Sequence, residues 1–258
     1  MYIDTHCHLD DPKLICRESE VVGSFLAAGV EKVINIGCTA ETSRITMEQA
    51  ERYPAVFFAA GVHPSDVSGY NDEGEGEILR LADHKKCVAI GEIGLDYHYP
   101  PVDKELQKRC FIRQMEIAKQ KKLPLSIHVR DAMGDAIAIL KEQRANLVYG
   151  GVMHCYSGSK ESAAILLDMG LYFAFGGTVT FKNAANLPKV AAYIPEDRIL
   201  TETDSPYLAP EGKRGTVNEP ANIPIILEKL ALIRNTDKET LAAAVMKNAL
   251  TLFPKLKT

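Results

Sequence analysis

Eight short apolar runs, each followed by a turn and then by a segment with helical periodicity, most constrain how this chain folds. They are MYIDTH, KVINIG, VFFAAGVH, CVAIGEIGLD, LPLSIHV, GGVMHC, LYFAFGG and RILTETD. Their hydrophobicity is nearly continuous, which is typical of parallel strands that helices cover. Eight strand–helix alternations in 258 residues predict a (β/α)8 TIM barrel. An open doubly wound sheet is the structural alternative, because the same alternation builds either fold.

The segments between the runs fit this interpretation. Residues 104–122 carry an apolar stripe that includes Leu106, Cys110 and Met115, so we expect a helix there. A terminal helix is expected after Asp237, packed against the outside. The acidic residues 69–77 (GYNDEGEGE) suggest a solvated loop that leads into a helix. No linker or change in composition divides the chain, so we expect residues 1–258 to form a single domain.

Composition limits the partners and the compartment. A net charge of −4 with no basic run argues against a protein that coats long nucleic acid, so any nucleic acid would be bound in a pocket. The sequence shows neither a signal segment nor an apolar run of membrane-spanning length, and we expect a cytoplasmic protein with no membrane contact. The six cysteines form no CxxC pair, which predicts reduced and mostly buried thiols.

Histidines and carboxylates gather at the carboxyl ends of the predicted strands. They are His6 and His8 on the first run, His63 on the third, Glu92 on the fourth, His128 on the fifth, His154 on the sixth and Asp204 on the eighth. In a barrel these ends converge on one mouth, where active sites are built. A single buried histidine is usually a hydrogen-bonded core residue, but this many at equivalent positions predict a metal site.

The number of donors indicates two ions. Four imidazoles and two carboxylates exceed the needs of one tetrahedral ion, but they suit two ions about 3.5–4 Å apart that a carboxylate and a hydroxide bridge. Two divalent ions, two carboxylates and the hydroxide would leave a charge of about +1, which suits an anionic substrate. We expect two divalent ions per chain, with Mg, Mn or Zn as candidates, and mixed nitrogen and oxygen ligands disfavour a pure Mg cage.

Seven motifs in order along the chain resemble the TatD metal-dependent deoxyribonucleases of the amidohydrolase superfamily. They are IDTHCHLD, GVHP, GEIGLDYH, IHVRDA, HCYSGS, TETDSPYLAP and NEPANIP. The resemblance implies a barrel with His6, His8, Glu92, His128, His154 and Asp204 as metal ligands, and a nuclease that acts on DNA. One departure is visible. Members of the family often carry two basic residues before Asn-Glu-Pro, whereas here Thr216 and Val217 precede Asn218, and Arg214 is the nearby candidate for binding phosphate.

Roles for the acidic residues follow from this scheme. Our hypothesis is that the hydroxide between the metals attacks phosphorus, while Asp204 orients that water and takes its proton. Glu202 lies one layer below Asp204, so we expect it to support a ligand or to accept a proton. A buried polar residue in the barrel floor is an equal alternative. Asp4 has the same relation to His6, and we expect it to support that ligand.

Substrate contacts are expected around the mouth. His63 lies on a strand end that supplies no other ligand, and the resemblance favours a donor to a substrate phosphate or leaving oxygen. Arg130 is expected to pair with a phosphate, the alternative being a salt bridge with Asp131 or Asp135.

Three tyrosines, Tyr97, Tyr156 and Tyr207, are candidates for stacking nucleobases, although exposed tyrosines are common. Strand alternation predicts that Cys7 and Cys155 turn away from the metals and serve packing.

The leading hypothesis is a two-metal phosphodiesterase that trims single-stranded DNA ends, as a 3'-5' exonuclease, with no obligate protein partner. The alternative is a metal-dependent hydrolase of carboxylic esters or amides, such as an aminoacyl ester, because the same ions polarise a carbonyl. A third possibility is a non-catalytic binding module, which would have little reason to keep six ligand-type residues at strand ends.

Overall fold

The computed structural model describes residues 1–257, and these residues build one sheet of eight parallel strands. The strands are β1 (Tyr2–Cys7), β2 (Val30–Ile36), β3 (Val56–Ala60), β4 (Cys87–Asp96), β5 (Leu125–Arg130), β6 (Gly151–Met153), β7 (Tyr172–Phe175) and β8 (Ile199–Thr201). Each strand pairs with the next one along the chain. All eight predicted strands are confirmed.

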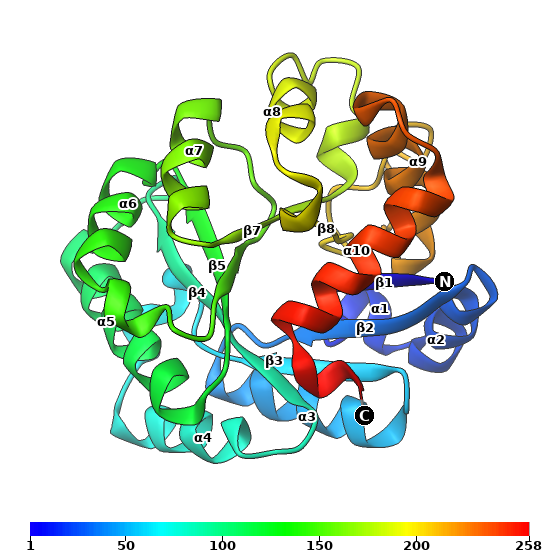
Figure 1. Cartoon of the computed structure of the whole chain (residues 1–258). Helices are drawn as coiled ribbons and strands as arrows, with labels where there is room; N and C mark the ends of the chain where they lie inside the picture. Colours follow the sequence, from blue (N-terminus) through cyan, green and yellow to red (C-terminus); the bar gives the residue numbers. More distant parts are fainter. Residues whose placement is uncertain (258) are drawn as a thin grey trace.

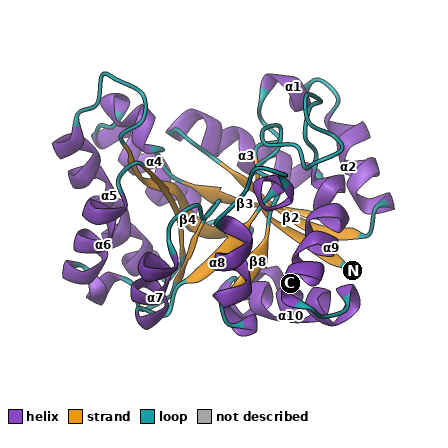
Figure 2. Ribbon diagram, turned by 90° about the horizontal axis from the view of Figure 1, so that it is seen from above, coloured by secondary structure: helices purple, strands orange, loops and turns teal. Residues whose placement is uncertain are grey.

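Helices connect the strands and surround them. The α-helices are α1 (Pro12–Ile15), α2 (Glu18–Ala27), α3 (Ala40–Arg52), α4 (Asp72–Ala82), α5 (Lys104–Lys121), α6 (Met133–Glu142), α7 (Lys160–Asp168), α8 (Leu187–Tyr193), α9 (Ile223–Arg234) and α10 (Lys238–Leu252). Short 3-10 helices are η1 (Pro64–Gly69), η2 (Arg144–Asn146), η3 (Gly177–Thr180), η4 (Glu196–Arg198), η5 (Pro220–Asn222) and η6 (Pro254–Lys257). Figures 1 and 2 show the helices outside the strands in two perpendicular views.

The sheet closes where the first strand meets the last. Cys7 pairs with Ser205 in a parallel bridge, and the backbone N–H of Asp204 donates to the carbonyl of His6 at 2.9 Å. The first and last strands therefore lie side by side, in a sheet whose order follows the sequence. This arrangement confirms the TIM barrel and excludes the open doubly wound sheet.

β4 positions the centre of the barrel mouth. All ten of its residues are buried, and Glu92, Gly94 and Asp96 occupy alternate positions along it. Gly94 has a φ of 143°, and a Cβ at this residue would lie 1.9 Å from the carbonyl oxygen of His128 on β5. Only glycine permits so close an approach. It allows β5 to pair in the register that brings His128 beside Glu92.

Two helix predictions are confirmed and one loop prediction is wrong. α5 begins at Lys104 as predicted, and α10 follows Asp237 and packs against α9, β8 and β1. The acidic residues 72–77 form the first turns of α4 instead of a loop. The Asn71 side chain caps this helix, and acidic residues in a first turn interact favourably with the helix dipole.

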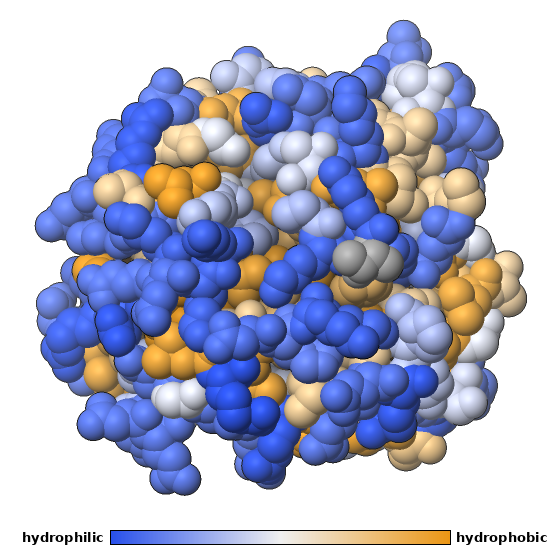
Figure 3. All heavy atoms as spheres, turned by 60° about the horizontal axis from the view of Figure 1, so that its bottom comes forward, coloured by the Kyte–Doolittle hydropathy of each residue, from blue (hydrophilic) through white to orange (hydrophobic). Residues whose placement is uncertain are grey.

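The hydrophobic core lies between the strands and the surrounding helices, and all eight strands contribute to it. Figure 3 shows one face of the molecule, where hydrophilic side chains predominate and hydrophobic residues form small separate patches. Across residues 1–257, no helix combines the length and the apolar character needed to cross a bilayer. Apolar side chains fill this core, whereas the buried histidines and carboxylates lie at the carboxyl ends of the strands.

Candidate metal centre

The residues predicted as ligands meet at the end of the barrel where the carboxyl ends of the strands converge. They are His6 on β1, His8 directly after it, Glu92 on β4, His128 on β5, His154 directly after β6 and Asp204 beyond β8. Four of them are buried, and His128 and Asp204 are partly exposed. The fold thus brings together side chains that are up to 198 positions apart in the sequence.

Glu92 lies at the centre of this cluster and presents its two carboxylate oxygens to different histidines. Oε2 lies 3.4 Å from His6 Nε2 and 3.7 Å from His8 Nε2. Oε1 lies 2.9 Å from His128 Nδ1 and 3.6 Å from His154 Nε2. The carboxylate therefore divides the four histidines into two pairs, one on each oxygen.

Asp204 completes the cluster from the β8 side. Its Oδ1 lies 3.5 Å from His8 Nε2, 3.7 Å from His154 Nε2 and 3.9 Å from His6 Nε2. The strand itself ends at Thr201, so Asp204 reaches the centre from the following loop, with a left-handed φ of 56°. Such a conformation costs about 1–3 kcal/mol in a residue other than glycine, and it concentrates at functional sites.

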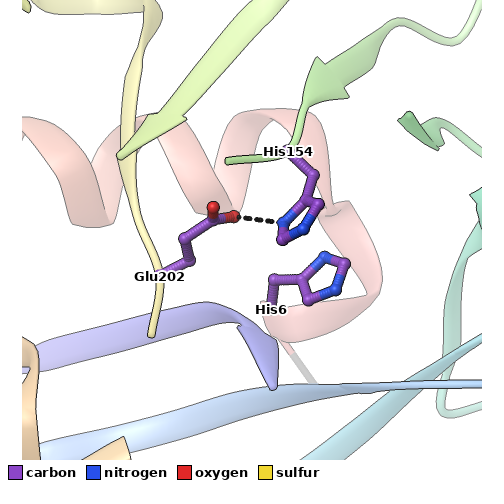
Figure 4. Close-up of side chains that lie close together, drawn as sticks. All are labelled: His6, His154 and Glu202. Carbon is purple, nitrogen blue, oxygen red and sulfur yellow. Dashed lines mark hydrogen bonds and ion pairs between the residues drawn. The ribbon is translucent and has the colours of Figure 1, made fainter. Parts of the chain in front are cut away.

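Hydrogen bonds determine which ring nitrogen of His8 and His154 faces the cluster. His8 donates from Nδ1 to the carbonyl of Ile36 at 3.0 Å. His154 donates from Nδ1 to Glu202 Oε2, also at 3.0 Å (Figure 4). In a neutral imidazole the other nitrogen then carries a lone pair. Both Nε2 atoms therefore point into the cluster, where a lone pair is available once the ring is neutral.

His128 follows the same rule with its nitrogens exchanged. Nε2 donates to the carboxylate of Asp96 at 3.1 Å, and Nδ1 faces Glu92. The sequence analysis missed Asp96. Its position four residues after Glu92, on the same face of the strand, was the available signal.

His6 presents the clearest evidence that the centre fits cations. Its ring stacks on His154 with centroids 3.4 Å apart (Figure 4), and its Nδ1 lies 3.5 Å from the Ser126 hydroxyl. Its Nε2 lies 3.2 Å from His8 Nε2. Two lone pairs at this separation repel each other unless a proton or a metal ion lies between them. Imidazole and carboxylate donors are the set that suits Zn, Mn or related divalent ions.

His63 has the opposite orientation from the other histidines. Its Nδ1 accepts a hydrogen bond from the backbone N–H of Ser65 at 3.1 Å as it caps η1. The proton of the neutral ring is therefore on Nε2, which lies 3.7 Å from Glu92 Oε1. Burial lowers the pKa of His63 to about 4, which keeps the ring neutral. His63 thus presents a donor N–H to the barrel mouth. Its ligand atom also lies within 4.8 Å of those of Glu92 and His128, so its position alone would also suit a metal ligand.

The carboxylates keep their charge despite their burial. Burial favours the neutral form of Glu92, but the imidazoles of His6, His63 and His154 outweigh it and lower its pKa well below the usual range. The pKa of Asp204 is also lowered, because the facing histidines again outweigh burial. The centre therefore holds two ionised carboxylates among its imidazoles.

The two acidic residues below the ligands differ in what they touch. Glu202 is 1% exposed and accepts hydrogen bonds from His154 and from the backbone N–H of Cys155. This contact favours support of a ligand over an unengaged position in the barrel floor. Asp4 instead accepts from the backbone N–H groups of His6 and Thr203. It joins the backbone of β1 to the loop after β8 and makes no hydrogen bond to the His6 ring.

Arg130 lies exposed at the rim of the mouth. Its guanidinium lies 4.9 Å from the centroid of the Tyr99 ring. Asp131 and Asp135, the salt-bridge partners considered in the sequence analysis, pair with other side chains. The salt-bridge alternative is therefore wrong.

Arg214 is held in a similar way, in the loop that follows β8. Its guanidinium lies 4.5 Å from the centroid of the Phe181 ring, and the residue is exposed. Within residues 1–257, no carboxylate pairs with Arg214 or with Arg130. Both cations are thus available to an anion from solution.

The tyrosines near the mouth differ in how far their rings are exposed to a nucleobase. Tyr156 is buried against Phe173 and offers no face to a base, so this candidate is wrong. Tyr97 is partly buried and donates to a carboxylate. Tyr207 is 47% exposed, as a stacking residue must be. The sequence analysis missed Tyr99, which is 65% exposed, and its place in the loop directly after the fourth strand was the signal.

Cys155 differs from its prediction. The expectation that strand alternation turns its thiol away from the centre is wrong, because β6 ends at Met153 and Cys155 adopts a left-handed φ of 42°. Its Sγ and donor atoms of His154 and Asp204 all lie within 4.8 Å of one another. Cys7, in contrast, is turned away as predicted and is fully buried.

Cys38 is a second thiol at the centre, and the sequence analysis missed it. It lies two residues after the end of β2, near a strand end like the other site residues, and this position was the signal. Its Sγ lies 3.8 Å from His8 Nδ1 and 3.9 Å from Glu92 Oε2. The second strand therefore also contributes to the centre.

Comparison with known proteins gives a consistent result. The model of the TatD related DNase family matches residues 3–254. The metal-dependent hydrolase YabD of Bacillus subtilis, named as uncharacterized, is 41% identical over 253 residues, which cover 98% of this chain and 99% of that protein. The 3'-5' ssDNA/RNA exonuclease TatD of Salmonella typhimurium is 36% identical over 255 residues, covering 97% and 98%. The crystal structure of YJJV, a TatD homologue from Escherichia coli K12, has a TM-score of 0.93 and 30% identity over 98% of both chains.

The barrel and its cluster of imidazoles and carboxylates define a metal-dependent hydrolase. The chain belongs to the TatD related DNase family, with the match extending over nearly its whole length. This result confirms the family expected from the seven sequence motifs.

Proposed function

We propose that this protein is a divalent-metal-dependent 3'-5' exonuclease that removes nucleotides from single-stranded DNA. The orientation of the imidazoles carries the proposal. His8, His128 and His154 are each held by a hydrogen bond at one ring nitrogen so that the other nitrogen faces the cluster, whereas His63 presents an N–H. Such a site combines ligands for cations with a donor for an anionic substrate. The direction and the single-stranded substrate follow the named activity of the Salmonella relative.

We propose two ion positions, separated by the Glu92 carboxylate. The first ion would be held by His6, His8 and Glu92 Oε2, and the second by His128, His154 and Glu92 Oε1, with Asp204 available to both. Divalent ions bound there supply positive charge to phosphate oxygens and acidity to water. The candidates are Mg, Mn and Zn, and the four imidazoles favour Mn or Zn over Mg.

In this proposal Asp204 moves the proton that hydrolysis releases. Its carboxylate is 14% exposed, compared with 4% for Glu92, so it borders the space that a substrate enters. Its low pKa keeps it ionised and ready to orient a water molecule and accept its proton. The buried Glu202 accepts a hydrogen bond from His154 Nδ1 and so holds this ring toward the ions.

In this proposal His63 acts on the substrate and not on the ions. Its Nε2–H donates to a phosphate oxygen or to the leaving oxygen, and its low pKa holds the ring in this neutral donor form. A fixed donor of this kind stabilises the charge that develops in the transition state.

The residues at the rim of the mouth favour binding of a short single strand of DNA over a long duplex. Arg130 and Arg214 bind backbone phosphates there, and the exposed rings of Tyr99 and Tyr207 offer faces for stacking bases. With a net charge of −4 the molecule offers few cations for a long backbone. All six cysteines are free thiols, which supports action in a reducing compartment such as the cytoplasm.

The test uses purified protein that is stripped of metal and reloaded with Mg²⁺, Mn²⁺ or Zn²⁺. Stepwise loss of single nucleotides from the 3' end of 5'-labelled single-stranded DNA is the expected result. Asp204→Asn should abolish this loss, whereas the exposed control Asp168→Asn should retain it. Binding of two ions without cleavage of DNA would contradict the nuclease proposal. It would favour the alternative, a hydrolase of carboxylic esters or amides.

A further inference from the structure

The centre contains a sulfur atom that the nuclease scheme does not use. Cys155 is only partly buried, and its Sγ, one nitrogen of His154 and one carboxylate oxygen of Asp204 lie within 4.8 Å of one another. Thiolate, imidazole and carboxylate are the three ligand types that zinc binds in proteins. The three residues come from the loops after β6 and β8.

We infer that Cys155 is a sulfur donor to the metal centre and that it makes the centre select zinc over magnesium. The inference deepens the proposed function, because it rests on ions binding among the ligands named above. Soft thiolate ligands favour zinc, whereas magnesium requires oxygen ligands and rejects sulfur. The remaining donors are nitrogen and oxygen atoms that also accept manganese.

The distances are suitable for coordination. Zinc binds sulfur at about 2.3 Å and nitrogen or oxygen at about 2.0–2.2 Å, so tetrahedral donors lie about 3.6 Å apart. His154 Nε2 lies 3.7 Å from Asp204 Oδ1, and the donor atoms of the three residues all lie within 4.8 Å of one another, close to this separation. On coordination the S–H bond breaks, the proton leaves to the solvent, and the sulfur lone pair forms the bond to the ion.

The backbone at Cys155 directs the thiol toward the centre. The residue has a left-handed φ of 42°, and its N–H donates to Glu202 Oε1 at 2.6 Å. The other oxygen of the same carboxylate accepts from His154. One buried carboxylate therefore holds both the neighbouring imidazole and the peptide that carries the thiol.

Cys38 provides a matched control within the same centre. Its Sγ lies 3.8 Å from His8, but at Nδ1, the nitrogen that is bonded to Ile36 and faces away from the cluster. Cys38 is also partly exposed. It resembles Cys155 in exposure and also lies 3.9 Å from Glu92 Oε2. Among the described residues, however, Cys38 belongs to none of the groups of three donor atoms that lie within 4.8 Å of one another.

Cobalt substitution tests the inference directly. The full-length protein loaded with Co²⁺ should show a near-ultraviolet sulfur-to-cobalt charge-transfer band. Cys155→Ser should abolish the band, and Cys38→Ser should retain it. Persistence of the band in Cys155→Ser, or its absence from the cobalt-loaded wild type, would overturn the inference while leaving the metal centre itself intact.

Metal affinity and thiol reactivity give readouts that do not depend on nuclease activity. Cys155→Ser should weaken Zn²⁺ binding at least about tenfold, measured against a chromophoric chelator, and leave Mg²⁺ binding unchanged. Zn²⁺ should protect Cys155 of the wild type from iodoacetamide, mapped by peptide mass spectrometry, while the exposed Cys16 continues to react. Equal loss of Zn²⁺ and Mg²⁺ affinity would contradict zinc selection. A protein that binds no divalent ion would refute both this inference and the proposed centre.

Discussion

The Nδ1–H of His154 donates a hydrogen bond to the buried carboxylate of Glu202 at 3.0 Å, and this contact orients the ring toward the metal centre. Glu202 thereby selects the tautomer whose Nε2 faces the cluster, and it makes the imidazole a stronger ligand. We expect Glu202→Gln to lower metal affinity about 10- to 100-fold. Titration of the stripped protein with Zn²⁺ against a chelator measures this change.

The control for Glu202 is Glu161→Gln, which removes the charge of an exposed glutamate on α7. Its metal affinity should equal that of the wild type. Wild-type affinity in Glu202→Gln would instead mean that the carboxylate fills the barrel floor without supporting His154.

His63 and His128 face the same carboxylate oxygen, yet we expect opposite effects from replacing them. His63→Ala should lower kcat about 10²-fold or more, with metal content unchanged, because it removes a donor to the substrate. His128→Ala should lose metal, because it removes a ligand. Elemental analysis beside single-turnover kinetics separates the two effects.

His98→Ala is the matched control, since this exposed histidine pairs with Asp131 at the rim. It should change neither metal content nor the rate of the chemical step. Loss of metal from His63→Ala would place His63 among the ligands.

Gly94 fixes the pairing of β4 with β5, so a side chain there should destabilise the barrel. In Gly94→Ala the Cβ would lie 1.9 Å from the carbonyl oxygen of His128 at a φ of 143°. We expect the free energy of unfolding to fall by about 3 kcal/mol or more. Denaturant titration of the metal-free protein measures it.

Gly23→Ala provides the contrast for this substitution. Gly23 lies within α2, and a Cβ there would have no atom within 4 Å. This variant should be stabilised by about 0.5–1 kcal/mol, because alanine favours the helix. Equal stabilities of the two variants would show that the β4–β5 contact tolerates displacement.

Removal of metal should lower the melting temperature. The centre crowds four imidazoles around two carboxylates, and bound ions stabilise only the folded chain. At a free Zn²⁺ concentration 100 times Kd, we expect about 2.7 kcal/mol of added stability. Thermal denaturation with EDTA and with increasing Zn²⁺ measures the shift, and the His128→Ala protein should respond less. An identical response of both proteins would locate the stabilising ion elsewhere.

Arg130 should contribute to strand binding through phosphate. Arg130→Ala should weaken the binding of single-stranded DNA and reduce the slope of log K against log salt by about 0.7. Arg144→Ala, which removes an arginine that pairs with Asp168, should leave the slope unchanged. Weaker binding at an unchanged slope would mean that Arg130 acts only by supporting the Tyr99 ring.

The sequence by itself determined the order of the strands and helices and the set of candidate ligands. Strand and helix periodicities are local properties, and the carboxyl ends of parallel strands in a barrel share one mouth. Residues such as His6 and Glu92 could therefore be assigned to one centre without coordinates. The seven motifs likewise identified the family before any comparison.

Only the tertiary structure decided how each side chain faces the centre. The ring of His154 is oriented by Glu202, 48 positions away, and that of His128 by Asp96, 32 positions away, and no local pattern specifies such contacts. Strand alternation fails at Cys155, because the strand has already ended and the backbone turns left-handed there. The sequence thus determined which chemical groups reach the mouth, whereas long-range hydrogen bonds and loop conformation decided which atom each group presents.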